Sequence, residues 1–392
     1  MVIAKESAPH LRRKASVTRM MVDVLIALAP TLIFSFVVFW LNTLVFYLIS
    51  VVVMVGAEFV YVGLRNMMPA DGQKHSFKER FAYAYKGKFN QNNVLTAAIS
   101  AIIYTLIMPA GAPIYAVIVG ALAGIVLGKL VFGGLGSNIF NPAAVGMIVA
   151  KICFGSQYLP VGFEQAVPAG YLPTTTWFYS APTALSLSGD VIAAPTALGQ
   201  INGWNFGNLG VYGLKDLFFG RVPGTLGEVY TITIIIGLAY LLIRRSADFR
   251  IVCSYFGTFG LLTLIAGLSV YAVDGVTNPI RFTLYYGLSG GVLFGGAFML
   301  TDPVTSPINS PSRIIYGMVA AVATIFIRLF AALPEGVGFS ILIANMVAVV
   351  LDHYEWSSSR YTWKKFLTMG LLVVVPALII FLSIKCGGVY HV

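Results

Sequence analysis

Two threonines in one long loop, each within a copy of the same pentapeptide, are the residues most suggestive of covalent attachment. The pentapeptide Ala-Pro-Thr-Ala-Leu occurs at 181–185 and again at 194–198, and Asp190 precedes the second copy. Its threonines, Thr183 and Thr196, carry hydroxyl groups that can be esterified, and an ester to a cofactor would hold that cofactor in place. An ordinary threonine in a Pro-rich turn is the alternative, and composition alone favours it.

Carboxylates in or beside apolar segments form a second group of candidates. Asp23 and Glu58 lie within the first two apolar segments, and Glu228 begins a later one. Asp302 and Glu335 stand at the ends of apolar segments in the second half of the chain. A carboxylate at membrane depth is costly, so Glu58, Glu228 and Asp23 are candidates for the path of a transported ion or proton. A helix cap or a salt bridge to another subunit is the structural alternative.

Two Gly- and Pro-rich segments, 128–142 and 294–307, each pass from an apolar helix through a glycine pair and polar residues to a proline and a new apolar helix. Their likeness indicates an internal repeat, and interrupted helices at corresponding positions of two halves point to a binding site between the halves. Freed backbone polar groups are tolerated in a membrane only beside protein or a cavity. Asn138, Asn141 and Asp302 are therefore predicted to bind a cofactor, with helix N-termini as further donors. Close packing of glycine-rich helices is the alternative.

Composition places these residues in an integral membrane protein. Hydrophobic residues make up 58% of the 392 residues and charged residues 10%, which excludes a soluble globular protein. The net charge of +10 lies mostly in short loops between apolar segments, a distribution that argues against a nucleic-acid partner. The three cysteines and four histidines show no metal-ligand spacing, so no metal site is predicted.

Apolar runs long enough to cross a bilayer recur from end to end of the chain. We predict an all-α integral membrane protein with about ten or eleven transmembrane helices, an inverted internal repeat and two broken helices. The predicted spans are 21–41, 43–64, 94–109, 113–131, 139–156, 226–243, 251–271, 283–300, 314–332, 336–352 and 366–385.

Lysine and arginine residues set the predicted orientation and domain organisation. Most of the 25 lie on the side of the N-terminus, which places that terminus in the cytoplasm, and no cleavable signal peptide is predicted. The predicted parts are a cytoplasmic tail (1–20), a first transmembrane half (21–156), an extracytoplasmic loop with both threonines (157–225) and a second transmembrane half (226–392).

Five motifs give the chain a family resemblance. They are Ser-Ala-Pro-His-Leu-Arg at 7–12, Phe-Gly-Gly-Leu-Gly-Ser-Asn-Ile-Phe-Asn-Pro at 132–142, Gly-Arg-Val-Pro-Gly-Thr-Leu-Gly-Glu at 220–228, Phe-Met-Leu-Thr-Asp-Pro-Val-Thr-Ser at 298–306 and Leu-Pro-Glu-Gly at 333–336. With these motifs the chain resembles, over most of its length, the RnfD/NqrB family of membrane subunits. These subunits belong to the ion-translocating ferredoxin:NAD oxidoreductase and the sodium-pumping NADH:quinone reductase. The run Thr-Asp-Pro-Val-Thr-Ser-Pro and the short N-terminal tail are more similar to RnfD.

The resemblance implies an FMN joined by a phosphoester to a threonine of the outer loop, and it leaves open a second, non-covalent flavin. The family pattern is an acid, a few residues, then Ser or Thr, Gly, Ala and the attachment Thr. Thr196 keeps the acid as Asp190 but has Ala193 in place of the serine. Thr183 keeps the serine as Ser180 but has no acid upstream. Thr196 is the predicted attachment site and Thr183 the alternative.

The resemblance further implies an electron-carrying subunit of an Rnf-type complex in the bacterial cytoplasmic (inner) membrane. Its FMN would relay electrons between the ferredoxin and NAD branches while the complex moves Na⁺ or H⁺, and the chain alone would not be a complete enzyme. Implied partners are the other Rnf subunits, including a second covalent-FMN subunit and iron–sulfur subunits, a periplasmic flavin transferase and the lipid bilayer. Two alternatives stay open: a small-solute channel or secondary transporter without flavin, which the repeat also suits, and a structural scaffold for other redox subunits.

Overall fold

The computed structural model describes residues 17–39, 41–67, 77–86, 89–109, 112–154, 198, 213–220, 222, 224–228, 230–331, 336–353, 356 and 358–386. Thr183, Thr196 and Glu335 therefore lie outside the described residues. The described residues form helices and connecting turns, with one isolated bridge between Pro109 and Thr225 and no β-strand among them.

Five of the described helices are long and apolar enough to cross a membrane. They are α1 (Val17–Phe39), α2 (Leu41–Asn66), α10 (Phe249–Asp274), α13 (Ser310–Phe330) and α15 (Trp363–Cys386). Helix α11 (Pro279–Leu288) and, after a bend of 65°, α12 (Val292–Phe294) with the π-helical turn η6 (Gly295–Met299) together have the length and composition of a broken span or a re-entrant loop. These helices confirm the predicted all-α membrane class.

Several predicted spans are shorter helices. They are α4 (Gln91–Leu106), α5 (Ile114–Ile125) continued by the π-helical turn η1 (Val126–Leu130), α6 (Pro142–Phe154), α9 (Thr231–Arg244) and α14 (Val337–Leu351). The 13 residues of α6 rise only about 20 Å, less than a hydrocarbon core of about 30 Å. The predicted series of crossings therefore corresponds to five or six long spans and a set of shorter apolar helices. Two short helices, α3 (Phe77–Tyr85) and α8 (Leu214–Phe219), lie outside this series.

Both predicted helix breaks are present, and they share one organisation. After η1 the Val131 N–H donates to the Val126 carbonyl at 3.0 Å, and after η6 the Leu300 N–H donates to the Gly295 carbonyl at 2.9 Å. Each π-helical turn is followed by a non-helical loop and by a helix with proline in its first turn, α6 or α13. Such turns are rare and frequently mark functional sites. The bend between α11 and α12 is an additional break that the sequence did not predict.

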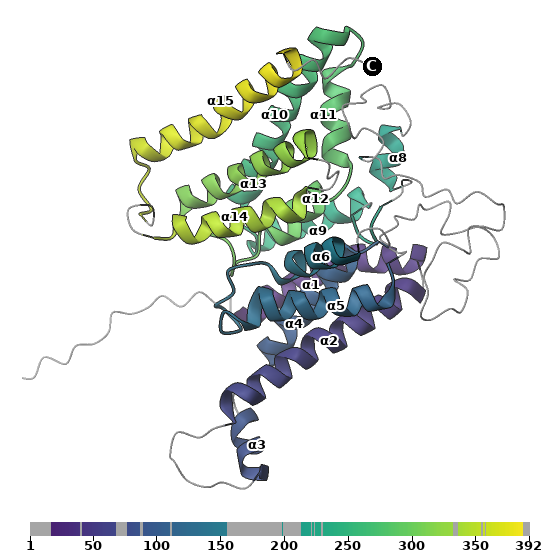
Figure 1. The fold of residues 1–392 in the computed structure, drawn as a ribbon, viewed down its shortest axis with the longest axis vertical. Helices are drawn as coiled ribbons and strands as arrows, with labels where there is room; N and C mark the ends of the chain where they lie inside the picture. The colour runs from purple at the N-terminus through teal and green to yellow at the C-terminus, as the bar shows by residue number, and fades with distance from the viewer. Residues whose placement is uncertain are drawn as a thin grey trace, which may run out of the picture.

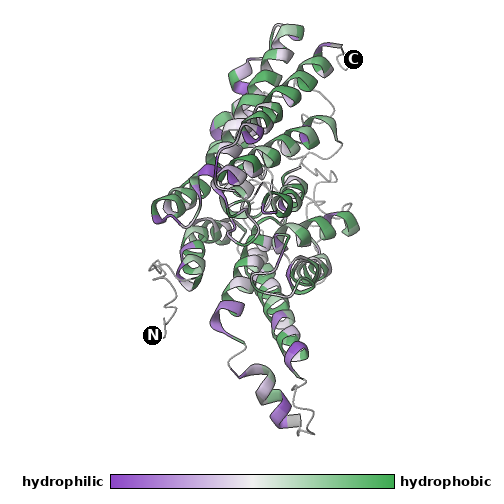
Figure 2. Ribbon diagram, turned by 90° about the vertical axis from the view of Figure 1, so that its left-hand side faces the viewer, coloured by the Kyte–Doolittle hydropathy of each residue, from purple (hydrophilic) through white to green (hydrophobic). Residues whose placement is uncertain are grey.

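The two halves of the chain form two groups of helices, α1 to α6 below and α10 to α15 above in Figure 1. Helix α9 packs against α1, and α6 contacts α14, so these helices form the boundary between the halves. Figure 2 shows hydrophobic residues along most of the helices and hydrophilic residues in α3, at the lower end. On α15, Phe366, Leu371 and Leu378 are exposed, as expected for side chains that face lipid.

Candidate functional site

An open pocket lies between the two helix breaks. Its polar lining includes Lys129, Asn138 and Asn141 at the first break and Thr301 and Asp302 at the second. Its apolar lining includes Met21, Val24, Ile99, Ile103, Leu241 and Phe298. The pocket and its open mouth together enclose about 780 Å³ of space, part of which is open solvent. The three residues that the sequence predicted to bind a cofactor thus share one pocket.

Asn141 joins the two breaks directly. Its Nδ2 donates to the carbonyl oxygen of Met299 at 3.3 Å, at the end of η6. Its Oδ1 accepts from the N–H groups of Ala143 at 3.0 Å and Ala144 at 3.4 Å, and so caps the first turn of α6. Asn138 makes a single local bond of 3.4 Å, from its Nδ2 to the Phe140 carbonyl. Asn141 therefore positions the two repeat units, while Asn138 offers its side chain to the pocket.

Asp302 lies in the loop after η6, beyond the last residue of that span. Its carboxylate accepts from the Val304 N–H at 3.2 Å and from the Thr305 hydroxyl at 3.3 Å. Burial raises the pKa of this carboxyl, and the two hydrogen bonds and the Lys129 charge oppose that shift. Asp302 therefore keeps its proton to a higher pH than an exposed aspartate.

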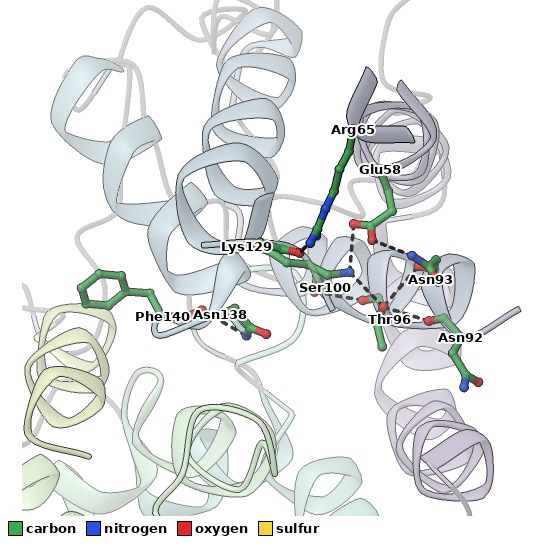
Figure 3. Close-up of polar contacts among 10 residues, drawn as sticks. Glu58, Arg65, Asn92, Asn93, Thr96, Ser100, Lys129, Asn138 and Phe140 are labelled. Carbon is green, nitrogen blue, oxygen red and sulfur yellow. Dashed lines mark hydrogen bonds and ion pairs between the residues drawn. The ribbon is translucent and has the colours of Figure 1, made fainter. Parts of the chain in front are cut away.

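A buried ion pair lies beside the pocket (Figure 3). The Lys129 ammonium is 2.9 Å from Glu58 Oε2 and donates to Thr96 Oγ1 at 2.9 Å. Asn93 Nδ2 donates to Glu58 Oε1 at 3.1 Å. Glu58 is 1% exposed and Lys129 is 2% exposed, so both charges are removed from solvent. Gly128 lets η1 approach α6 here, because a Cβ at Gly128 would lie 2.7 Å from the Cα of the first residue of α6.

Asp23 lies in a different setting. Its carboxylate accepts hydrogen bonds from Ser246 Oγ at 2.7 Å, Tyr240 Oη at 3.2 Å and Arg244 Nε at 3.2 Å. These contacts tie α1 to the end of α9 and to the turn after it. Asp23 therefore has the partners of a structural salt bridge, although Ser246 also lines the pocket.

A second polar region surrounds the bend between α11 and α12. Arg328 on α13 donates to the carbonyl oxygens of Tyr286 at 2.7 Å and Ser289 at 3.1 Å, which are freed where α11 ends. Glu228 is buried in the turn before α9, with its carboxylate against Gly291. Arg328 and Glu228 thus bring opposite charges to one helix break, whereas the pocket lies at the other end of α9.

Leu198 is docked at the same bend. It is 4% exposed, and a Cβ at Gly290 would lie 2.7 Å from Leu198 Cδ1 and 3.1 Å from Arg328 Nη2. Gly290 has a φ of +64°, in the left-handed region that favours glycine. Leu198 is the last residue of the second Ala-Pro-Thr-Ala-Leu copy, so the structure places the end of that copy beside Glu228 and Arg328.

Comparison with known proteins decides the family. Residues 4–359 match the family described as NQR2, RnfD, RnfE. The chain belongs to this family. A similar protein is a subunit of the proton-translocating ferredoxin:NAD(+) oxidoreductase complex of Clostridium ljungdahlii, 29% identical over 89% of this chain and 93% of the relative. The predicted family is therefore confirmed, and with the apolar helices it identifies a multi-pass membrane protein.

Other relatives are subunits of the Na(+)-translocating NADH-quinone reductase. The one from Chromohalobacter salexigens is 33% identical over 65% of this chain and 57% of its own length. The one from Azotobacter vinelandii is 32% identical over 70% of this chain and 62% of its own length. The chain thus spans less than two thirds of these quinone-reductase relatives and nearly all of the ferredoxin-oxidoreductase relative.

The sequence-based search for the site missed two residues, Lys129 and Arg328. Both are charged residues within apolar helices, and that signal alone marks a functional candidate in a membrane protein. The predicted span 113–131 puts Lys129 near its end, where a lysine indicates only orientation, but the structure buries Lys129 against Glu58. Among the described residues, no group of three His, Cys, Asp or Glu side chains is placed to hold a metal ion.

Proposed function

We propose that this chain is the electron-carrying membrane subunit of an Rnf-type complex, with FMN esterified to Thr196. The observation that carries the attachment site is the docking of Leu198 at the bend between α11 and α12. Leu198 follows Thr196 by two residues in the sequence, which supports Thr196 as the attachment site. Thr183 remains the alternative, and it has no comparable anchor among the described residues.

The bend offers chemistry that suits a flavin phosphate. The glycine pair Gly290 and Gly291 lets another chain segment approach the backbone closely. The Arg328 guanidinium supplies positive charge, and guanidinium groups pair well with phosphate oxygens. A bound FMN would supply one-electron transfer, and the residues of the bend would hold it at a fixed distance from its redox partners.

We propose the pocket between the breaks as the site of a second, non-covalent flavin. Lys129, Asn138 and Thr301 provide hydrogen-bonding groups, and Ile99 and Phe298 provide apolar walls for a flat ring. The 14 residues of α9 separate this pocket from the bend by about 20 Å. Two flavins held at these ends would be separated by about the length of α9.

The family places the chain among subunits of larger complexes, which supports the proposed partners. These are other Rnf-type subunits, including iron–sulfur subunits and a second covalent-FMN subunit, with a flavin transferase that acts on the outer loop. The proposed location is a bacterial inner membrane with the N-terminus in the cytoplasm. Relatives are named both proton-translocating and Na(+)-translocating, so the coupled ion is Na⁺ or H⁺, with Glu58 and Glu228 as candidates for its path.

Mass spectrometry of peptides from the native, membrane-purified protein tests this function. An FMN-sized adduct on the peptide that contains Thr196, with a fluorescent gel band after denaturation, is the expected result. Expression in cells that contain the flavin transferase is required, because the ester is made by that enzyme. An unmodified loop under those conditions would refute the electron carrier and favour a solute transporter built on the same repeat.

A further inference from the structure

The Lys129 ammonium faces two carboxylates. On one side it pairs with Glu58 Oε2 at 2.9 Å. On the other side it lines the pocket together with Asp302, in the loop after η6. Lys129 of the first helix break and Asp302 of the second therefore face the same pocket.

The ion pair is closed on the α2 side and open on the pocket side. Glu58 is almost fully buried and receives Asn93 Nδ2 at 3.1 Å. Lys129 and Thr96 both line the pocket, and their contact is 2.9 Å long. A small cation in the pocket would therefore meet Lys129 and Thr96 before it met Glu58. Figure 3 shows the Lys129 ammonium in contact with both Glu58 and Thr96, and Asn93 in contact with Glu58.

The net charge of the cluster formed by Glu58, Lys129 and Asp302 favours the binding of one more cation. Glu58 and Lys129 balance each other in charge. Once Asp302, whose pKa burial raises, has lost its proton, the cluster holds two negative charges and one positive charge. A buried charge without a partner is unfavourable, so such a cluster attracts a further cation. The Glu58 carboxylate and the Thr96 hydroxyl are hard oxygen donors, the kind that hard cations bind.

We propose that Lys129 is a tethered cation that exchanges with a transported monovalent cation at Glu58. In the structure the Lys129 ammonium is paired with the Glu58 carboxylate. When the transported cation enters from the pocket, the lysine side chain turns to Asp302, and the cation takes its place on Glu58 and Thr96. No bond is formed or broken in this step, and the cluster gains one positive charge. The inference rests on the ion-translocating part of the proposed function and names its cation site.

Acetylation of lysines in the intact complex by acetic anhydride measures this exchange. The rate at Lys129, read by mass spectrometry, is divided by the rate at Lys151 on α6. Replacing choline chloride by NaCl at equal ionic strength is expected to raise this ratio by about tenfold. A rise of this size corresponds to about a tenfold increase in the fraction of Lys129 that is displaced from Glu58. If the cation is a proton, the ratio rises in choline chloride when the pH is lowered, and it does not respond to Na⁺. A ratio that follows neither Na⁺ nor pH would overturn the proposal.

Two variants test the same point. Glu58→Gln removes the charge that holds Lys129, so the ratio should be high in choline chloride and should no longer respond to Na⁺. The matched control Glu79→Gln, on the exposed helix α3, should keep the wild-type response. A Glu58→Gln protein with the low wild-type ratio in choline chloride would show that another group holds Lys129. Asp302→Asn removes the second partner and should reduce the Na⁺-induced rise, which keeps the test decisive if Glu58→Gln does not assemble.

Flavin fluorescence of the same preparation separates this inference from the electron-carrier proposal. If the acetylation ratio at Lys129 responds to Na⁺ or pH in protein without covalent flavin, the cation site is supported and the electron-carrier proposal is refuted. If the protein carries covalent flavin but its acetylation ratio at Lys129 changes with neither Na⁺ nor pH, the electron-carrier proposal is supported and the cation exchange is refuted.

Discussion

Asn141 at the first helix break donates a hydrogen bond from its Nδ2 to the carbonyl oxygen of Met299 at the second break, over 3.3 Å. The same side chain accepts from Ala143 and Ala144 and caps α6. One buried asparagine thus couples the two repeat units and the start of a helix. This coupling explains how two loops far apart in sequence form a single pocket.

Asn141→Ala should lower the stability of the protein measurably. It removes a helix cap worth about 1 kcal/mol and leaves a buried carbonyl without this partner, which costs about 1–3 kcal/mol more. Thermal unfolding in detergent, followed by intrinsic fluorescence, measures the loss. Asn138→Ala is the control, because it removes one local bond of 3.4 Å. Equal losses in the two variants would contradict the role given to Asn141.

Lys129→Met should destabilise the protein more strongly, because it leaves the Glu58 charge buried without its partner. Breaking one side of a buried ion pair typically costs about 3–5 kcal/mol. The double variant Lys129→Met with Glu58→Gln should recover most of the loss, since no unpaired charge remains. Thermal unfolding of the single and the double variant measures the effect, and Lys151→Met is the control for the loss of a lysine on another helix. No recovery in the double variant would mean that Lys129 contributes mainly through packing.

Much of the fold and part of the site were predictable, and the reasons differ from residue to residue. Apolar runs and the Gly–Pro segments around Asn138 and Asp302 are local signals, and the structure has helices and breaks there. The partner of Glu58 is not a local signal, because Lys129 lies in another helix and pairs only after α2 packs on η1. The bend at Gly290 was missed because glycines are common in membrane helices, and because Leu198, which contacts it, comes from a distant loop.

Asp23→Asn should lower stability and should leave ion transport intact. Asp23 is 4% exposed and its carboxylate accepts from Ser246, Tyr240 and Arg244. Asparagine keeps the shape of the side chain but replaces an acceptor oxygen by a donor, and a buried hydrogen bond lost in this way costs about 1–3 kcal/mol. Ion uptake into vesicles that contain the complex, compared with Glu58→Gln, measures the effect. If Asp23→Asn loses transport and Glu58→Gln does not, Asp23 lies on the ion path and Glu58 does not.

Thr196→Ala should abolish covalent flavin, and Thr183→Ala should leave it in place. The reason is the proposed ester to Thr196, next to the anchor at Leu198. In-gel flavin fluorescence, with immunoblotting to normalise the amount of protein, measures both variants. Full labelling of Thr196→Ala together with loss in Thr183→Ala would move the attachment site to the first pentapeptide.

Gly290→Ala should reduce covalent flavin although it changes no residue of the attachment loop. The added methyl group would meet Leu198 at 2.7 Å, and an alanine with positive φ is strained by about 1–2 kcal/mol. Both effects act against the docking of Leu198 and hence against a fixed position of Thr196. Leu198→Ala should reduce labelling for the same reason, since it removes the docked side chain. Gly287→Ala on α11 is the matched control, because a Cβ there meets no atom within 4 Å. Labelling that is intact in Gly290→Ala and in Leu198→Ala would show that attachment does not depend on the bend, and the argument that places the flavin there would then fail.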